Sequence, residues 1–173
     1  MNLNHFLKKL QKKETLYLKM PSSDLPSLSD ADLFYAVTIR TENKVDACHD
    51  LQEGLAALND KERIFYAVNY LEVEVNNGGL CQFFVNASRA VAPLVSEYLG
   101  MIGAFEQQKL YDDFIGKYHI DVTDLSSFDI ESFEDFTAQY ERYPFDEFDD
   151  AFYKMTPLQD YLTKFVRENI GDF

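Results

Sequence analysis

Few side chains in this sequence have the type and spacing that catalysis requires. Cys81 follows two adjacent glycines, and a thiol at a helix N-terminus can ionise and act as a nucleophile. A catalytic thiolate also needs a base beside it, but the three histidines, His5, His49 and His119, are scattered along the chain. We therefore predict no catalytic residue and a protein that is not an enzyme.

The residue spacing predicts neither a metal site nor a phosphate-binding site. Cys48 and Cys81 have no partner histidines at the intervals of a zinc site. Residues 121–132 and 146–157 are acidic, but neither segment has glycine at its sixth position or glutamate at its twelfth, as a calcium-binding loop requires. The adjacent glycines lack the following Gly-Lys-Ser or Gly-Lys-Thr of a phosphate-binding loop. We expect no metal and no cofactor.

The two glycines belong to a break in a helical pattern, VNNGGLCQFF at residues 75–84. Asn77 and Gly78 are the residue types that accept a positive φ at the lowest cost, so they predict the end of the helix that begins near residue 60. Gly79 would then let the next helix leave at a sharp angle.

Two carboxamides follow the break. Gln82 and Asn86 are four residues apart, so they share one face of the second helix, where their amides can satisfy the polar groups of a buried turn. We interpret the break as a packing corner between two helices. The alternative is a pocket beneath Asn77, Gln82 and Asn86 that binds a small molecule or holds an enzymatic site.

The corner must be positioned by the elements around it, and helical periodicity extends over most of the chain. One stretch places four apolar side chains on a single helical face: Ile64, Val68, Leu71 and Val75. Ser29 and Asn59 are each followed three residues later by an acid, which is typical of a helix start. Only residues 15–20 alternate as a strand would, and that run is short. We expect an all-α fold, a single compact domain of about eight to ten helices with no substantial sheet.

The N-terminal residues differ in charge from the rest. Residues 1–20 carry five lysines and one acid, and the apolar stripe of Leu3, Phe6, Leu7 and Leu10 predicts an amphipathic helix. Residues 21–30, PSSDLPSLSD, are typical of a linker. We therefore divide the chain into a basic segment over residues 1–28 and an acidic helical domain over residues 29–173. We expect the basic segment to dock on that domain, and a membrane surface is the alternative.

Acidic residues dominate the rest of the chain, and the formal net charge of the protein is -14. Residues 121–150 alone contain eleven acids, opposed only by Arg142. Such a field repels nucleic acids and anionic membranes and attracts basic partners over about one Debye length, ~8 Å at physiological salt. No apolar run has the length of a membrane span or a signal peptide. We expect a cytoplasmic protein that contacts neither nucleic acid nor membrane directly.

Aromatic rings and acids alternate at helical spacing in residues 128–152. We expect the rings to lie in the core, with Phe133, Phe136 and Tyr140 in one helix, and Phe145, Phe148 and Phe152 in the next. The carboxylates would then face outward as a protein-binding surface formed by Asp112, Asp113, Asp121, Asp124, Asp129, Glu131, Glu134, Asp135, Glu141, Asp146, Glu147, Asp149 and Asp150. The plainer interpretation is a solvated face that keeps the protein in solution.

Residues 63–88, RIFYAVNYLEVEVNNGGLCQFFVNAS, resemble a small bacterial family of acidic DNA-mimic proteins. The motif is Asn-Gly-Gly-x-x-Gln-Phe-Phe-x-Asn, and Leu80, Ala87 and Arg89 depart from the family's pattern. The resemblance implies an all-helical homodimer that occupies the DNA-binding surface of a transcriptional regulator. Because these matching residues form the packing corner, we interpret them as a structural motif: Glu72, Asn77, Gly78, Gly79, Gln82, Phe83, Phe84 and Asn86.

Charge and resemblance together predict a non-enzymatic interaction protein. Its carboxylates would occupy the lysines and arginines with which a transcriptional regulator or nucleoid protein binds phosphates. One alternative is an immunity protein that caps a basic toxin nuclease, which has the same electrostatics.

Overall fold

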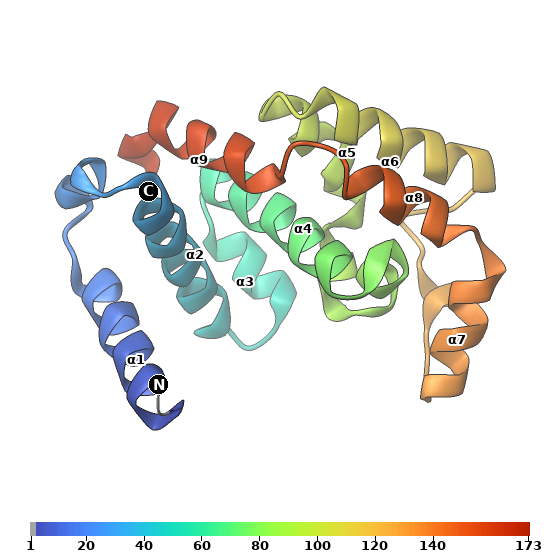
Figure 1. Ribbon diagram of the computed structural model, residues 1–173, viewed down its shortest axis with the longest axis horizontal. Helices are drawn as coiled ribbons and strands as arrows, with labels where there is room; N and C mark the ends of the chain where they lie inside the picture. Colours follow the sequence, from blue (N-terminus) through green and yellow to red (C-terminus); the bar gives the residue numbers. More distant parts are fainter. Residues whose placement is uncertain (1–2) are drawn as a thin grey trace. The chain divides into compact units, whose positions relative to one another are not determined.

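Helices make up the described part of the chain, residues 3–173, in this computed structural model, and no strand occurs there (Figure 1). In this part, nine α-helices and four 3₁₀ helices follow one another in the order α1 (Leu3–Lys19), η1 (Ser22–Ser27), α2 (Asp30–Asp46), α3 (Leu51–Ala57), α4 (Asp60–Val85), η2 (Ala87–Val91), α5 (Ala92–Met101), α6 (Phe105–Tyr118), η3 (Ser126–Phe128), α7 (Phe133–Arg142), α8 (Phe145–Phe152), α9 (Leu158–Glu168) and η4 (Ile170–Asp172). The all-α prediction is confirmed. Residues 15–20, the strand-like run, lie at the end of α1 and just beyond it.

The chain forms two compact units. The first unit consists of the described residues up to Tyr66 together with Thr163–Phe173, and the second unit consists of Ala67–Leu162. The boundary between them lies inside α4 and again inside α9. The boundary that we expected after residue 28 lies within the first unit.

In the first unit, the basic helix α1 packs against α2. Lys13 Nζ lies 2.7 Å from Asp32 Oδ1, and the hydroxyl of Tyr17 donates to the same oxygen at 2.8 Å. Hydrogen bonds from Lys13, Tyr17 and Ser29 lower the pKa of Asp32 to about 2. Arg40 Nε donates to the carbonyl oxygen of Tyr17 at 3.0 Å. These polar contacts hold the N-terminal segment on its own unit.

The apolar stripe of α1 contributes less than its pattern predicts. Leu10 is half-buried and Leu7 is exposed. The side chains of Leu3 and Phe6 lie outside those that the structure describes.

The segment predicted to be a linker is an ordered 3₁₀ turn, η1. Leu25 is fully buried within it. Arg167 donates to the carbonyl oxygens of Pro26 at 3.0 Å and Leu28 at 2.6 Å, and its guanidinium also pairs with Asp30. The segment does connect α1 to α2, and a buried leucine and an arginine from α9 fix it in place.

Two predicted helix starts form as their sequences indicate. Ser29 Oγ accepts a hydrogen bond from the N–H of Asp32 at the start of α2. At the start of α4, Asn59 Oδ1 accepts from the N–H of Glu62, and Glu62 Oε2 accepts in return from the N–H of Asn59. Each exchange satisfies N–H groups that a helix end leaves without partners.

The core of the second unit is built from rings. Phe84 is fully buried, and its ring centroid lies 5.2 Å from that of Phe128, 5.8 Å from Phe83 and 6.3 Å from Phe145. Helix α5 packs against α6, and α6 packs against α8. The predicted burial of Phe145, Phe148 and Phe152 is confirmed.

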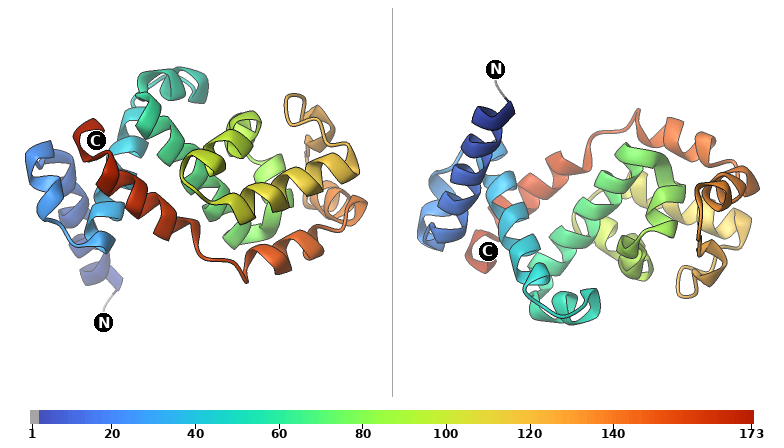
Figure 2. Two further views of the ribbon diagram at one scale, coloured as in Figure 1. Left: turned by 90° about the horizontal axis from the view of Figure 1, so that it is seen from above. Right: turned by 90° about the horizontal axis from the view of Figure 1, so that it is seen from below.

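Helix α7 contacts this core through Tyr140, whose ring centroid lies 5.9 Å from that of Phe145, although all three of its rings were expected to be buried there. None of residues 133–142 is buried, and Phe133 is 78% exposed. Figure 2 shows α7 at an edge of the second unit. The expectation was wrong for Phe133, which lies in the first turn of α7, whereas Phe136 and Tyr140 are half-buried.

The helix break occurs where the sequence places it, but its backbone differs in one detail. Gly78 has φ −162° and ψ 25°, and Gly79 has φ 78° and ψ 178°. The positive φ therefore falls on Gly79, whereas we expected it at Asn77 or Gly78. The combination at Gly79 belongs to a backbone region that is essentially restricted to glycine.

We expect Gly79→Ala to lower the free energy of unfolding by about 2–4 kcal/mol, because a Cβ there is strained and would overlap the carboxylate of Asp149. Gly103→Ala tests a positive φ without the overlap, because its φ is +81° but its Cβ would meet no described atom within 4 Å. Gly116→Ala, inside α6, should be neutral or slightly stabilising. Urea unfolding followed by circular dichroism should rank the three variants in this order, and equal losses for Gly79→Ala and Gly103→Ala would contradict the overlap.

Candidate functional site

The corner at the helix break is organised by one buried carboxylate, Glu74. Its side chain accepts hydrogen bonds from Gln82 Nε2 at 2.7 Å, from Asn86 Nδ2 at 2.8 Å and from Ser88 Oγ at 2.8 Å. Glu74 is 9% exposed, so these donors take the place of water. The two carboxamides thus meet at the corner, and they do so through an acid that precedes the break.

A second carboxylate from the same helix, Glu72, caps α9. Its oxygens accept from the backbone N–H groups of Leu158 at 2.6 Å and Gln159 at 2.8 Å. Burial raises the pKa of Glu72, and the two backbone hydrogen bonds oppose that shift. These two hydrogen bonds fix the start of α9, where unpaired N–H groups attract negative charge.

Asp149 is the third buried carboxylate of the second unit, so its predicted place in the exposed surface was wrong. It is 6% exposed, and Oδ1 accepts from the N–H of Leu80 at 2.9 Å. Gly79, with no Cβ, lets the carboxylate approach the backbone at the break. Burial raises the pKa of Asp149 to about 6, the Leu80 hydrogen bond opposes this, and the charges of Asp146 and Asp150 add to it.

The thiol of Cys81 at this corner is not activated. Burial, followed by the charge of Asp149, raises the pKa of the Cys81 thiol to about 12, so this thiol is protonated at neutral pH and is a poor nucleophile. Within residues 3–173, no group of three His, Cys, Asp or Glu side chains is placed to hold a metal ion.

A shallow groove lies beside the corner. It has a volume of about 550 Å³ and is lined by Gln82, Val85, Asn86, Ile130, Glu131, Ser132, Phe133 and Phe136. One wall comes from the end of α4 and the other from the start of α7. The groove thus joins two motif carboxamides to the exposed ring of Phe133. Asn77 does not line it.

The start of α7 is fixed by hydrogen bonds. Ser132 Oγ accepts from the N–H of Asp135, and Asp135 Oδ2 accepts from the hydroxyl of Ser132 and from the N–H of Glu131. These bonds lower the pKa of Asp135. The rings of Phe133 and Phe136 stack at 6.4 Å with 26° between their planes, and Phe136 and Tyr140 stack at 6.2 Å and 30°.

All members of the predicted acidic surface except Asp149 are exposed, namely Asp112, Asp113, Asp121, Asp124, Asp129, Glu131, Glu134, Asp135, Glu141, Asp146, Glu147 and Asp150. Two of them form ion pairs, Asp113 with Lys109 and Asp129 with Arg89. Asp121 and Asp124 accept from neighbouring turn residues, which lowers the pKa of each. Asp146 accepts from the hydroxyl of Tyr140.

Negative charge is concentrated in one of the two units. The second unit holds eighteen of the 30 acids against five of the 16 basic residues, a net charge of −13. The first unit accounts for the remaining −1 of the total of -14. The first unit is nearly neutral because it contains both the basic helix α1 and the acids that offset its charge.

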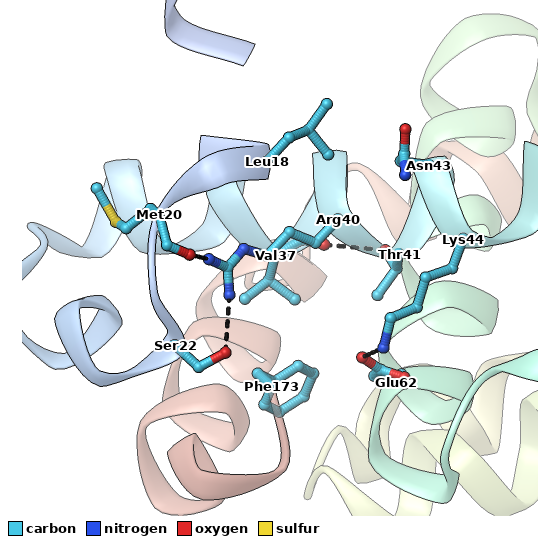
Figure 3. A pocket seen from close by; sticks show the side chains of 10 residues that line it. All are labelled: Leu18, Met20, Ser22, Val37, Arg40, Thr41, Asn43, Lys44, Glu62 and Phe173. Atoms are coloured by element: carbon cyan, nitrogen blue, oxygen red, sulfur yellow. Dashed lines mark hydrogen bonds and ion pairs between the residues drawn. The ribbon is translucent and has the colours of Figure 1, made fainter. Parts of the chain in front are cut away.

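The first unit has a pocket of about 300 Å³ (Figure 3), lined by Leu18, Met20, Ser22, Val37, Arg40, Thr41, Asn43, Lys44, Glu62 and Phe173. Its charged side chains bond to neighbours that are themselves part of the wall. Arg40 donates to Ser22 Oγ at 3.2 Å and to the carbonyl oxygen of Met20, and Lys44 Nζ lies 2.5 Å from Glu62. The pocket is therefore stabilised by its own ion pair and hydrogen bonds.

Across the described residues, no helix is both long enough and apolar enough to cross a membrane.

We expect Asp149→Asn to raise the free energy of unfolding by about 1–3 kcal/mol at pH 7.5, because asparagine keeps the acceptor for Leu80 without a buried charge. The folded-state pKa of about 6 exceeds the ordinary 3.8, so the folded protein binds more protons between these values and the carboxylate costs stability as pH rises through them. This increase in the free energy of unfolding should disappear at pH 4. Asp150→Asn, an exposed neighbour, is the matched control. Urea titrations at both pH values test this, and a less stable variant at pH 7.5 would contradict it.

Replacement of Gln82 and Asn86 by alanine should destabilise the fold by about 1–3 kcal/mol, because Glu74 loses two of its three donors. The discriminating measurement is thermal unfolding of the double variant. An unchanged midpoint would favour the alternative in which these amides serve a ligand.

A family model described as DMP19-like protein matches residues 56–169. No curated protein and no solved structure matches the chain. From the motif we expected a family of acidic DNA-mimic proteins. That assignment was wrong, because the matching model is the DMP19-like one, and its description states neither DNA mimicry nor the motif. The match spans more than half of the 173 residues, so the chain belongs to the DMP19-like protein family.

Proposed function

We propose that this protein is a non-enzymatic interaction protein whose second unit binds a basic surface of another protein. The observation that carries the proposal is the net charge of −13 on that unit, with twelve of the thirteen predicted surface acids exposed. Like charges held this close repel one another and lower stability, and a basic partner relieves that repulsion.

The partner class follows from the same electrostatics. Proteins that bind nucleic acids present clustered lysines and arginines to phosphates, at one charge per ~1.7 Å of duplex axis. Acids three and four residues apart on a helix have Cβ atoms ~5–6 Å apart. Short acidic helices such as α7 and α8 can therefore bind several basic side chains at once. We therefore propose the DNA-binding surface of a transcriptional regulator or nucleoid protein as the target, in the cytoplasm.

Binding would work by competition. The exposed carboxylates occupy basic side chains that would otherwise contact phosphates, and the counterions of both surfaces are released. Such binding weakens steeply as salt is added. The alternative function is that of an immunity protein that caps a basic toxin nuclease. It would use the same electrostatic contacts with a different partner.

The experiment is capture of partners from the source cells on the immobilised protein at low salt, followed by elution with duplex DNA. We expect basic DNA-binding proteins in the eluate, and a toxin nuclease there would favour the immunity alternative. The affinity for a captured partner should fall at least about tenfold between 50 and 200 mM salt. An affinity that does not change with salt would contradict the proposal.

Two charge-matched variants locate the surface. Glu134→Gln, Glu141→Gln and Glu147→Gln together remove three exposed acids of the second unit, and Asp24→Asn, Asp46→Asn and Asp172→Asn remove three exposed acids of the first unit. Because both variants change the net charge equally, only the position of the charges differs. We expect the first set to weaken binding about tenfold and the second set to have little effect.

A further inference from the structure

Helix α7 exposes more apolar surface than its place in the fold requires. Phe133 has the most exposed large apolar side chain among the described residues, at 78%, and its ring continues a stack through Phe136 to Tyr140. Single exposed apolar residues are ordinary on protein surfaces, but a contiguous apolar face is typical of an interaction site.

This face is held in place without being buried. Ser132 caps the first turn of α7, Gln139 Nε2 donates to the carbonyl oxygen of Ser127 at 2.6 Å, and Tyr140 donates to Asp146 at 2.5 Å. A surface that is fixed before binding loses little conformational entropy when a partner arrives.

The groove next to Phe133 offers hydrogen-bond acceptors rather than donors. The amide N–H groups of Gln82 and Asn86 are directed to Glu74, so the carbonyl oxygen of the exposed Asn86 side chain is left as an acceptor. Glu131 adds an exposed carboxylate to the same groove. A ring face beside two acceptors matches a planar cation that stacks and donates at the same time.

We propose that the groove between α7 and the end of α4 binds an arginine side chain of the partner, with the guanidinium stacked on Phe133 and donating to Glu131 and Asn86. This inference rests on the proposed function, because it assumes a basic partner. The same unit already contains such a pair, since the Arg142 guanidinium lies 5.3 Å from the ring centroid of Tyr143.

Other occupants fit the groove less well. A lysine is a compact, strongly hydrated charge that neither stacks as a plane nor donates in two directions within one plane. A second copy of this chain would bring another unit with a net charge of −13 against the groove. An apolar peptide would take water from Glu131 without replacing it.

The test uses fluorescein-labelled peptides that contain either three arginines or three lysines in an otherwise identical alanine and glycine sequence. Fluorescence anisotropy at about 20 mM salt measures binding to the full chain. We expect the arginine peptide to bind more tightly, and Phe133→Ala to weaken it about two- to fivefold. Phe105→Ala is the matched control, because Phe105 is also an exposed phenylalanine of the second unit, at 66%.

Three results would overturn the inference: equal affinity for the two peptides, an effect of Phe105→Ala as large as that of Phe133→Ala, or a dimer in sedimentation that Phe133→Ala dissociates. The charge variant with Glu134, Glu141 and Glu147 replaced should weaken both peptides, so it reports on the proposed function. If that variant acts as expected while Phe133→Ala does not, the groove is not the arginine site but the acidic surface stands.

Discussion

The second unit depends on carboxylates that are removed from water and satisfied by hydrogen-bond donors. An acid in a protein interior is costly unless such donors replace its hydration. Glu74 receives three side-chain donors, Glu72 receives the first N–H groups of α9, and Asp149 receives the N–H of Leu80. These bonds fix the helix break, the start of α9 and the position of α8, so one kind of contact determines how the helices of this unit meet.

Acidic residues thus serve two purposes within the second unit. Buried acids hold the corner, and exposed acids give the unit almost all of the charge of the protein. The aromatic core lies behind the exposed acids of α8, whereas α7 contacts that core through Tyr140 and leaves Phe133 at the surface. A basic partner would therefore meet carboxylates over α8, and carboxylates together with aromatic rings over α7.

The sequence predicted the helices, their caps and the buried aromatic core, because these depend on contacts close along the chain or on strong periodicity. It did not predict the burial of Asp149, whose partner Leu80 lies far away along the chain. A signal was present, since residue 149 shares a helical face with the buried rings of Phe145 and Phe152. The exposure of Phe133 left no such signal, because an amphipathic pattern does not reveal whether another element covers it.

The hydrogen bonds of Glu72 to the start of α9 also bear on how the chain acquires its structure. They join positions that are 86 and 87 residues apart, so a ribosome must release most of the second unit before they can close. Until α8 is made the N–H of Leu80 lacks Asp149, and until α9 begins Glu72 lacks its two backbone donors. Contacts of such long range slow folding and prolong the exposure of apolar surface. The high density of acids in the segment made during this interval would help to keep nascent chains apart.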